Sequence, residues 1–327
     1  MSVTLTHETT PEQAEAAVYA ALAADPAGVV VKVHGFPTEA LDVILGRLPD
    51  VYKVKGRGTS RVVIAADLAA RVGSGSATAW ERFASFNALG SHHTDPGGKN
   101  AGLASGKWRM NHAVKLWNDQ GVTVVTLSEF ETPQRLALLS HPRWAVFSAI
   151  PNNHFRDGNT MGNAIAWRKD VWELVDSYSI PVPITSRRLY MAAVILRHRQ
   201  TGLYSSFIAI HNPSTGPISG GSQADRENAK RIERDYAARL VDLGLPVVLG
   251  GDFNEHDAAQ AFPSLDRAVS AGVDFLFVDG AETKGARVKT KGVRGVLTDH
   301  PLVSALVGLF SSSQPTGKGP RLPRGLG

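Results

Sequence analysis

Polar side chains that could bind a metal ion or transfer a proton stand where strongly apolar segments end. The clearest case is GGDFN at residues 250–254, where Asp252 and Asn254 follow a predicted buried strand. Side chains two residues apart on a strand share a face, so both could point into one cleft. Similar positions beside apolar segments are taken by Asn87, Glu129, Asn163, His211, Asp274, Asp299 and His300.

The side chains in this set suit a hard divalent cation. Carboxylates that are close together and away from water repel one another, so they require a cation or protons nearby. Carboxylate and amide oxygens are the ligands that Mg²⁺ and Mn²⁺ prefer, and the chain has no cysteine to supply a thiolate. We therefore predict an Mg²⁺ or Mn²⁺ site where these strand ends converge.

Neighbouring glycine and proline residues affect how the polar side chains are held. Gly250 and Gly251 let the backbone approach a phosphate or a neighbouring chain without a Cβ between them. In TDHP, Pro301 favours an extended backbone at His300 and so restricts the direction of its imidazole. Each polar residue also has a plain structural reading, such as a turn for Asp252 or a helix cap for Glu129.

The bulk composition is that of a globular protein with a substantial core. The chain has 327 residues, of which 43% are hydrophobic and 20% charged. No apolar segment reaches the roughly 18–20 residues that span a bilayer, and the N-terminus does not resemble a signal peptide. We expect a cytoplasmic location and no membrane span. The oligomeric state is not predicted.

The positive charge is concentrated near the C-terminus. Residues 281–327 contain eight Lys and Arg and two acidic residues, whereas the formal net charge of the whole chain is +5. A local basic segment suits an anionic partner such as nucleic acid. A solvated loop with a basic tail explains the charge equally well, so charge alone does not decide between them.

The apolar patterns predict two domains. Residues 1–76 have the pattern of a small α/β domain of unknown role that ends in a GSGS linker at 73–76. Residues 77–310 alternate strands and helices, and residues 311–327 have the composition of a disordered basic tail. The clearest helices are predicted over 108–118, from Thr132 as N-cap through Leu139, and over 224–243.

Seven segments in order resemble the signature blocks of the endonuclease/exonuclease/phosphatase superfamily, which includes deoxyribonuclease I. They are SFNALG, VVTLSEF, GNAIAWRKD, FIAIHNP, VVLGGDFNEHD, GVDFLFV and LTDHPLV, and the resemblance spans roughly residues 80–306. It implies an α/β four-layer sandwich, with two packed β-sheets flanked by helices. It also implies Mg²⁺-dependent hydrolysis of a phosphate ester.

The resemblance also implies roles for individual residues. Glu129 matches the main metal ligand, with Asn87 and Asp299 at the same site. Asp252 and Asn254 match the pair that orients the attacking water and the phosphate, and Asp274 matches the carboxylate that bonds His300. His211 matches a histidine near the leaving group and Asn163 a phosphate-binding amide, and we add Lys289 and Lys291 as candidate phosphate contacts from the basic segment.

The leading hypothesis is a divalent-metal-dependent phosphodiesterase, a nuclease that cleaves DNA or another nucleic acid by metal-assisted in-line attack of water. One alternative is a phosphatase or phosphodiesterase on small or lipid-headgroup phosphates, and another is a non-catalytic polyanion-binding module. The residues NEHDAAQ after GDFN depart from the abasic-site endonuclease pattern, so that specificity is not predicted. We interpret His92, His93 and Asp95 of SHHTDPGG as a loop, and Arg109 as part of an exposed helix face.

Overall fold

The computed structural model describes most of the chain. The described residues are 2–24, 28–46, 52–55, 60–65, 79–149, 162–183, 188–215, 221–279, 281–309 and 320–324. The chain divides into two compact units, Met1–Ser76 and Ala77–Gly327. The GSGS segment predicted as a linker lies outside the described residues.

The first unit is a small α/β fold. Its described part has four strands and two helices: β1 (Ser2–Thr6), α1 (Pro11–Ala24), β2 (Gly28–His34), α2 (Thr38–Gly46), β3 (Tyr52–Lys55) and β4 (Ser60–Ala65). The strand order is β1-β2-β4-β3, with β1 parallel to β2. Apolar side chains from both helices and the sheet, among them Leu5, Val18, Val31 and Leu41, form its own core.

The second unit contains two six-stranded mixed sheets. Sheet I has the order β13-β14-β12-β11-β10-β9, and sheet II has the order β15-β16-β5-β6-β8-β7. The strands of sheet I are β9 (Trp172–Pro183), β10 (Arg188–His198), β11 (Tyr204–His211), β12 (Val247–Asp252), β13 (Asp266–Ala271) and β14 (Asp274–Asp279). Those of sheet II are β5 (Ala79–Asn87), β6 (Val122–Phe130), β7 (Trp144–Ser148), β8 (Gly162–Arg168), β15 (Thr283–Lys289) and β16 (Leu302–Leu309).

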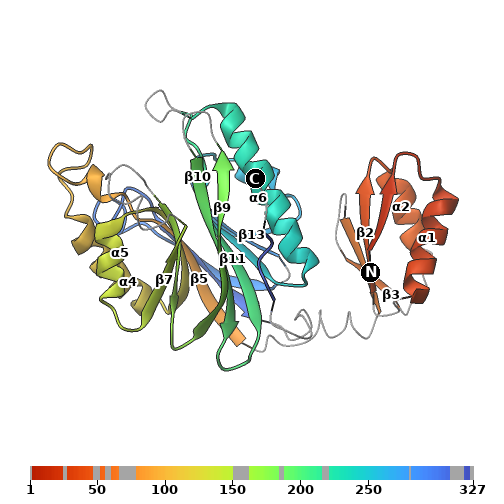
Figure 1. The fold of residues 1–327 in the computed structure, drawn as a ribbon, viewed down its shortest axis with the longest axis horizontal. Helices are drawn as coiled ribbons and strands as arrows, with labels where there is room; N and C mark the ends of the chain where they lie inside the picture. Colours follow the sequence, from red (N-terminus) through yellow and green to blue (C-terminus); the bar gives the residue numbers. More distant parts are fainter. Residues whose placement is uncertain are drawn as a thin grey trace. The chain divides into compact units, whose positions relative to one another are not determined.

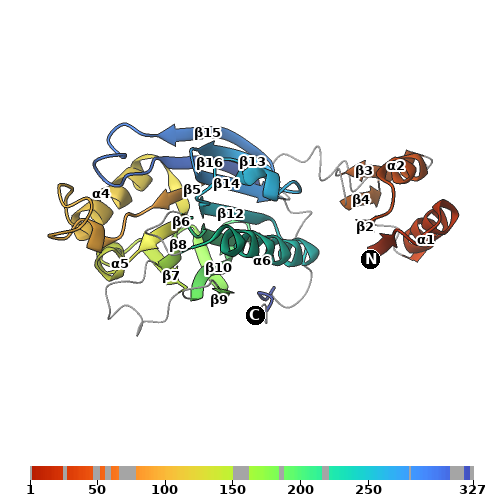
Figure 2. The same ribbon diagram turned by 90° about the horizontal axis from the view of Figure 1, so that it is seen from above.

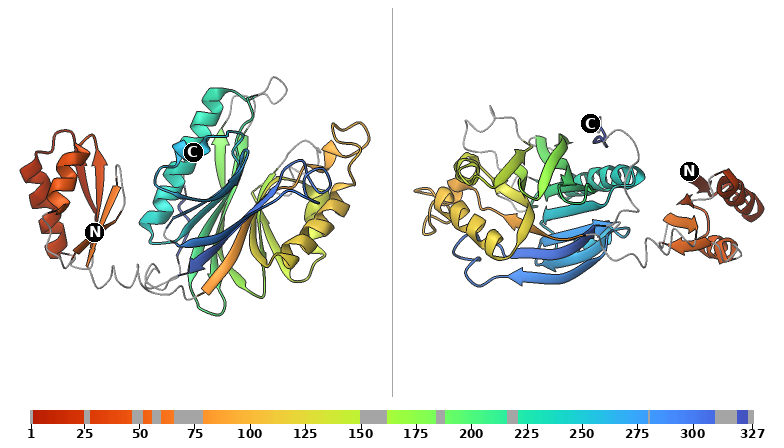
Figure 3. Two further views of the ribbon diagram at one scale, coloured as in Figure 1. Left: turned by 180° about the vertical axis from the view of Figure 1, so that it is seen from behind. Right: turned by 90° about the horizontal axis from the view of Figure 1, so that it is seen from below.

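Helices cover the outer faces of the two sheets. Figure 1 shows α4 (Gly106–Asp119) and α5 (Thr132–Leu139) beside sheet II, and α6 (Gln223–Asp242) beside sheet I. The view from behind shows the sheets face to face between these helices (Figure 3). The four-layer α/β sandwich is therefore confirmed.

Each of these helices has a capping side chain at its start. The Ser105 hydroxyl accepts the Trp108 N–H at the start of α4, and Ser222 forms a capping box with Asp225 at the start of α6. The prediction for α5 was wrong by one residue, because its N-cap is Glu131 rather than Thr132. The Glu131 carboxylate takes the capping position while Gln134 bonds back to the Glu131 N–H.

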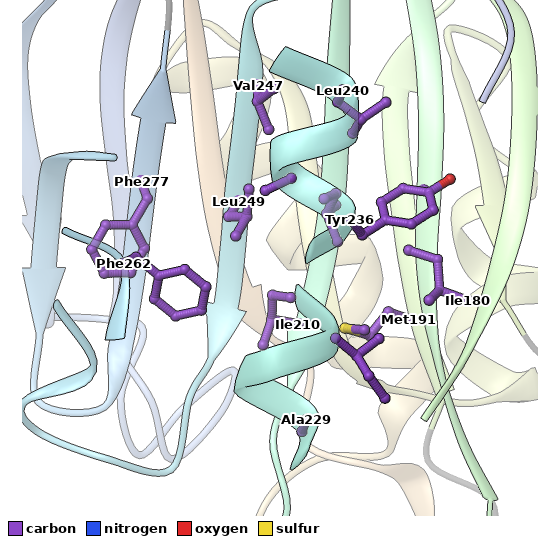
Figure 4. Close-up of a cluster of buried hydrophobic side chains, with 14 of the residues drawn as sticks. Ile180, Met191, Ile210, Ala229, Tyr236, Leu240, Val247, Leu249, Phe262 and Phe277 are labelled. Atoms are coloured by element: carbon purple, nitrogen blue, oxygen red, sulfur yellow. The ribbon is translucent and has the colours of Figure 1, made fainter. Parts of the chain in front are cut away.

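Helix α6 is held by one apolar stripe. Ala229, Ile232, Tyr236 and Leu240 recur at helical spacing, and all four are buried. They pack on sheet I residues including Ile180, Met191, Ile210, Val247 and Leu249 (Figure 4). Burying a large apolar side chain contributes about 1.5–3 kcal/mol to folding. The burial of this stripe therefore stabilises the packing of α6 on the sheet.

The interface between the sheets is largely apolar, with a small polar contact at one end. Phe83, Trp172 and Phe207 pack ring against ring in its centre. The Ser128 hydroxyl of sheet II donates to the Ile210 carbonyl of sheet I at 3.1 Å. This bond ties the two sheets together near the ends of β6 and β11.

The basic segment near the C-terminus begins as a strand rather than as a solvated loop. Residues Thr283–Lys289 form β15, which pairs with β16 and lies at the edge of sheet II (Figure 2). From Lys284 onward the strand is exposed, and the turn containing Lys291 and Arg294 follows it. The basic side chains therefore stand on an ordered edge strand and its turn.

The prediction of a disordered tail at 311–327 was wrong for residues 320–324. Leu322 is buried in the core beneath α6, and its backbone N–H donates to Asp176. The Tyr236 hydroxyl donates to the Pro323 carbonyl, and Arg324 pairs with Asp176 at 2.8 Å. The other residues of that segment lie outside the described part. Within the described residues, no helix is long and apolar enough to cross a membrane.

Candidate active site

The topology of the second unit brings the predicted site residues to one end of the sandwich. Each sheet contains one parallel pair, β5 with β6 and β11 with β12. The carboxyl ends of these strands carry Asn87, Glu129, His211 and Asp252. The antiparallel strand β14 begins at Asp274, which pairs with Asp252. Strand ends that are distant in the sequence therefore meet at the same end of the sheets.

Asn87 is the buried link between the carboxylates of the two sheets. Its Nδ2 lies 3.2 Å from Glu129 Oε1 and 3.2 Å from Asp252 Oδ2. Its Oδ1 accepts the Leu89 N–H at 2.9 Å, which fixes the orientation of the amide. The side chain is fully buried, so this geometry holds Glu129 and Asp252 at a defined separation.

Glu129 is placed by an irregularity in β6 rather than by the strand end that was predicted. The register of β6 against β8 shifts between Leu127 and Phe130, and Glu129 has a φ of 51°. Left-handed conformations in residues other than glycine are strained and cluster at functional sites. The carboxylate is 7% exposed, and it accepts the Gly90 N–H at 3.2 Å.

The Glu129 carboxylate is ionised in this environment. Burial alone would raise its pKa, but contacts with His93, Asn87 and the Gly90 N–H, together with the nearby His211, hold the pKa well below its usual range. A buried carboxylate that keeps its negative charge is a suitable ligand for a cation.

Asp252 and Asn254 are close together, but not by the strand geometry that was predicted. Asn254 lies beyond the end of β12 and has a φ of 52°, so the two-residue repeat of a strand does not apply to it. Its backbone N–H donates to Asp252 Oδ1 at 2.8 Å, and its Nδ2 donates to the Asn212 carbonyl at 2.8 Å. These bonds make a tight turn in which Asp252 is buried and Asn254 is partly exposed.

The glycines before Asp252 are required by close packing within the protein. A Cβ at Gly251 would overlap the Ile210 carbonyl on the neighbouring strand, and one at Gly250 would overlap Thr126 of the other sheet. The sequence left open whether these glycines allow the approach of a phosphate or of a neighbouring chain segment. The structure shows the close approach of a neighbouring segment.

His300 forms a close pair with Asp274. The His300 Nδ1 lies 2.8 Å from Asp274 Oδ2, and its Nε2 lies 3.6 Å from Asp252 Oδ2. Burial lowers the pKa of His300, but the bond to Asp274 and the nearby carboxylates outweigh it and raise the pKa to about 9. Burial raises the pKa of Asp274, although the bond to His300 opposes this. At neutral pH the pair is an imidazolium next to a carboxylate.

His211 is a second histidine near Asp252. Its Nε2 is 3.9 Å from Asp252 Oδ2, too far for a hydrogen bond, and its side chain is 17% exposed. Asp252 therefore has one imidazole at 3.6 Å and another at 3.9 Å. Both rings are partly exposed, at 17% for His211 and 19% for His300.

Asp299 borders the site but does not join Glu129 and Asn87. Its side chain is 40% exposed, and its contacts are with Thr298, His300 and Lys99. It lines an open cavity of about 490 Å³ together with Asn100, Gly102, Leu103, Arg294 and Gly295. Asp299 therefore faces a space that a substrate could occupy.

Three other predicted residues do not contact this cluster. Asn163 is buried near the start of β8, where its Nδ2 donates to the Tyr190 carbonyl at 2.9 Å. Its Oδ1 is buried and has no hydrogen-bond partner among the residues that the structure describes. Lys289 and Lys291 are exposed at the end of β15 and in the following turn.

Sequence reasoning placed Arg109 on an exposed helix face, and this was wrong. Arg109 is 1% exposed. Its guanidinium donates to the Ala88 and Leu89 carbonyls after β5 and to the Leu297 carbonyl before Asp299, at 2.5–2.8 Å. It thus joins the two loops that flank the site. The apolar spacing of α4 alone could not reveal a charge satisfied by backbone carbonyls.

His92 and His93 were interpreted as a solvent loop, but both contact carboxylates at the site. His92 Nδ1 pairs with Glu131, and His93 Nε2 lies 3.4 Å from Glu129 Oε2. The signal in the sequence was the SHHTDPGG motif a few residues after Asn87. The contacts of these histidines with Glu131 and Glu129 depend on the conformation of the loop, which no periodic pattern in the sequence predicts.

The residues present fit one divalent ion with few protein ligands. In the part of the chain that the structure describes, no three His, Asp or Glu side chains are arranged to enclose an ion. However, Glu129, Asp252 and Asp274 are all buried, and the contacts described above are with amides, backbone N–H groups and imidazoles. The His300 imidazolium offsets one of these three charges, and the negative charge that remains is one that a cation would balance. Glu129, with Asn87 beside it, fits an ion that keeps water or substrate oxygens as its other ligands.

Comparison with known proteins identifies the family of the chain and known structures with the same fold. The model of the Endonuclease/Exonuclease/phosphatase family matches residues 84–302, more than half of the chain. A solved endonuclease/exonuclease/phosphatase from Bacteroides vulgatus is 16% identical with a TM-score of 0.59, covering 71% of this chain and 100% of that one. No curated protein sequence matches the chain significantly.

Two further solved structures share the fold. The mannosyl-6-phosphatase of Bacteroides thetaiotaomicron is 15% identical with a TM-score of 0.54, covering 69% of this chain and 99% of that one. TDP2 of D. rerio, solved with a single-strand DNA product, is 11% identical with a TM-score of 0.53, covering 70% and 99%. At these identities the likeness is one of fold.

Proposed function

Because the chain belongs to the endonuclease/exonuclease/phosphatase family, whose members hydrolyse phosphoesters, we propose that it is a divalent-metal-dependent phosphodiesterase that cleaves nucleic acid. The observation that carries this proposal is the position of Asp252. It lies between Asn87, which bonds Glu129, and the His300–Asp274 pair. Glu129 as the cation ligand, Asp252 as the candidate base and the His300 imidazolium are thus close to one another.

Glu129, with Asn87 beside it, is the protein ligand for the ion. When bound there, Mg²⁺ or Mn²⁺ would supply Lewis acidity at the phosphoryl group. Asn87 has a separate role in this scheme, because its buried amide keeps Glu129 and Asp252 apart and correctly oriented. Preorganised groups of this kind need no rearrangement as charge develops in the reaction.

Asp252 is the candidate general base for the attacking water. It is 3% exposed, one oxygen accepts the Asn254 N–H, and the other faces Asn87 and His300. Asn254 is partly exposed at the turn and is positioned to orient the water or a phosphoryl oxygen. Proton transfer by a positioned carboxylate contributes about 10²–10⁴-fold to a rate.

His300 stabilises negative charge on the phosphoryl group. Its Nδ1–H is directed to Asp274, which leaves the Nε2–H for a phosphoryl oxygen. Burial of Asp274 at 1% exposure keeps this orientation. His211, whose Nε2 lies 3.9 Å from Asp252 Oδ2, is the candidate for a contact with the leaving oxygen.

The basic edge of sheet II supports nucleic acid as the substrate. Lys284, Arg287, Lys289, Lys291 and Arg294 are exposed along β15 and the turn that follows it. Arg294 and Asp299 both line the open cavity beside the site, so this turn and the site are neighbours. A phosphate backbone that enters the site could continue along the same edge. The fold is also shared with TDP2 of D. rerio, which was solved with a single-strand DNA product.

The test is a substrate panel with the full chain. Single-stranded DNA, plasmid DNA, RNA and mannose 6-phosphate are incubated with Mg²⁺ or Mn²⁺, with EDTA as the metal-free arm. We expect cleavage of a polynucleotide, its loss with EDTA, and its return when excess metal is added. Asp252→Asn should abolish cleavage, whereas Asp266→Asn, an exposed change at the start of β13, should not.

The other outcomes separate the alternatives. Release of phosphate from mannose 6-phosphate without DNA cleavage would favour a phosphatase, the activity named for the Bacteroides thetaiotaomicron structure. Retention of DNA without any hydrolysis would favour a polyanion-binding module. Full activity of Asp252→Asn would contradict the assigned site.

A further inference from the structure

The loop SHHTDPGG, residues 91–98, has a backbone that is closely constrained. Ser91–His93 form a 3₁₀ turn in which the His93 N–H donates to the Gly90 carbonyl. The His93 carbonyl accepts the Asn100 N–H at 2.7 Å, and a Cβ at Gly98 would overlap that same carbonyl. His93 is therefore held from both sides by backbone contacts.

The two histidines of the loop have different partners. His92 is bound into the cap of α5, because its ring and its backbone N–H both contact the Glu131 carboxylate. Glu131 is in turn the N-cap of that helix. His92 therefore has a structural explanation that is complete without a ligand.

His93 instead faces Glu129. Its Nε2 lies 3.4 Å from Glu129 Oε2, and this buried atom makes no hydrogen bond to any residue that the structure describes. An imidazole nitrogen that is kept from water costs free energy unless it gains a partner. The atom faces the carboxylate that is assigned as the metal ligand.

We propose that His93 is a second protein ligand of the metal ion bound by Glu129, through its Nε2 atom. This inference rests on the metal dependence of the proposed function. The spacing supports it, because two ligands at right angles and about 2.1 Å from an octahedral ion lie about 3 Å apart. The observed 3.4 Å between Nε2 and Oε2 is close to that value, with alignment that does not make a hydrogen bond.

A nitrogen ligand changes which ion the site prefers. Mg²⁺ is bound almost entirely by oxygen, whereas imidazole suits Mn²⁺ and the later first-row metals. His93 and Glu129 together form a mixed nitrogen and oxygen set with open positions for water and substrate. The site should therefore bind Mn²⁺, and Co²⁺ more strongly still, in preference to Mg²⁺.

The experiment uses Mn²⁺ bound to the full-length protein. Pulsed electron paramagnetic resonance of Mn²⁺ detects coupling to a directly bound ¹⁴N nucleus, and titration calorimetry gives the affinities for Mn²⁺ and Mg²⁺. The variant is His93→Ala, and the matched control is His92→Gln, which changes the adjacent ring and keeps a polar group beside Glu131. Thermal unfolding of both variants checks that they are folded.

We expect ¹⁴N coupling in the wild type and in His92→Gln, and its loss in His93→Ala. The Mn²⁺ affinity of His93→Ala should fall about 10-fold or more, the range seen when a metal's supporting groups are lost, and the Mg²⁺ affinity should fall less. Coupling that is absent in the wild type, or that persists in folded His93→Ala, would overturn the inference while leaving metal-dependent hydrolysis intact. Failure of the wild type to bind any Mn²⁺ or Mg²⁺ would overturn both.

Discussion

The Nδ1 atom of His300 lies 2.8 Å from Oδ2 of Asp274, and this bond joins the loop after β15 to the first residue of β14. Asp274→Asn keeps the shape of the side chain but removes the charge that stabilises the imidazolium. We expect kcat to fall about 10²–10⁴-fold with little change in fold. Steady-state cleavage of labelled DNA measures this, and an unchanged kcat would refute the role of the pair.

The same pair predicts a pH dependence. The His300 pKa is raised to about 9, so the imidazolium is present at neutral pH and is lost as the pH rises through that value. Activity that needs the imidazolium should therefore fall on the alkaline side near pH 9. Asp274→Asn removes a cause of the raised pKa, so the alkaline limit should move to lower pH. A pH–rate profile of both proteins checks the direction of this shift.

Lys289 and Lys291 were predicted as phosphate contacts, and both are exposed beside the cavity-lining turn. Replacing both by alanine should weaken DNA binding and reduce the slope of log affinity against log salt by about 1–2. Fluorescence anisotropy measures this, with Asp252→Asn as the background so that DNA is not cleaved. Lys115→Ala on the exposed face of α4 is the control, and an equal loss there would show that the effect is not local.

Arg109 satisfies backbone carbonyls of the two loops that flank the site. Arg109→Leu leaves those buried carbonyls without donors, and we expect a loss of about 3 kcal/mol or more in the free energy of unfolding. Arg109→Lys should also destabilise the protein, because a single ammonium cannot replace the planar group. Urea denaturation gives both values, and Arg231→Ala in an exposed ion pair on α6 should cost about 0.5 kcal/mol or less.

Gly251 has no room for a side chain against the Ile210 carbonyl. Gly251→Ala requires the backbone of a central strand to move, and we expect it to abolish folding or to lower the unfolding free energy by more than about 3 kcal/mol. Gly102→Ala is the control, since a Cβ at that position meets no atom of the described residues within 4 Å. Comparable stability of the two variants would show that the strand can shift without cost.

Glu233 on α6 is fully buried, and it accepts the Asn212 side-chain N–H at 3.3 Å. Burial raises the pKa of Glu233 to about 8 from a normal value of 4.5. The folded state thus holds a proton that the unfolded state releases, and stability should fall as the pH rises from 4.5 to 8. Glu233→Gln should remove this slope, so its stability relative to wild type should improve by at least about 1.4 kcal/mol between pH 5 and pH 8. Denaturation at the two pH values tests it.

Much of the fold and of the site could be predicted because they depend on local patterns. Apolar strands that end in Asn87, His211 and Asp252 were visible, and parallel strands bring such ends together. The strand ends need only strand length, polarity and order along the chain. The contact between His300 and Asp274 was implied by the family resemblance of the segments that contain them.

The remaining features depend on geometry that no periodic pattern encodes. Asn254 and Glu129 adopt left-handed conformations, and the former bonds to the Asn212 carbonyl rather than continuing the strand. Arg109 resembled a surface residue because its partners are carbonyls of distant loops. His93 resembled loop sequence because its contact with Glu129 requires the fold of the 91–98 loop.

The positive φ angles of Leu89, Glu129 and Asn254, at 51–52°, place three strained residues around one small volume. Such conformations cost about 1–3 kcal/mol each. Glycine at position 129 would release part of that energy while deleting the metal ligand. Selection for thermal stability alone should therefore favour substitutions here that inactivate the enzyme. A variant that keeps the strained residues under such selection would be one in which catalysis is also required.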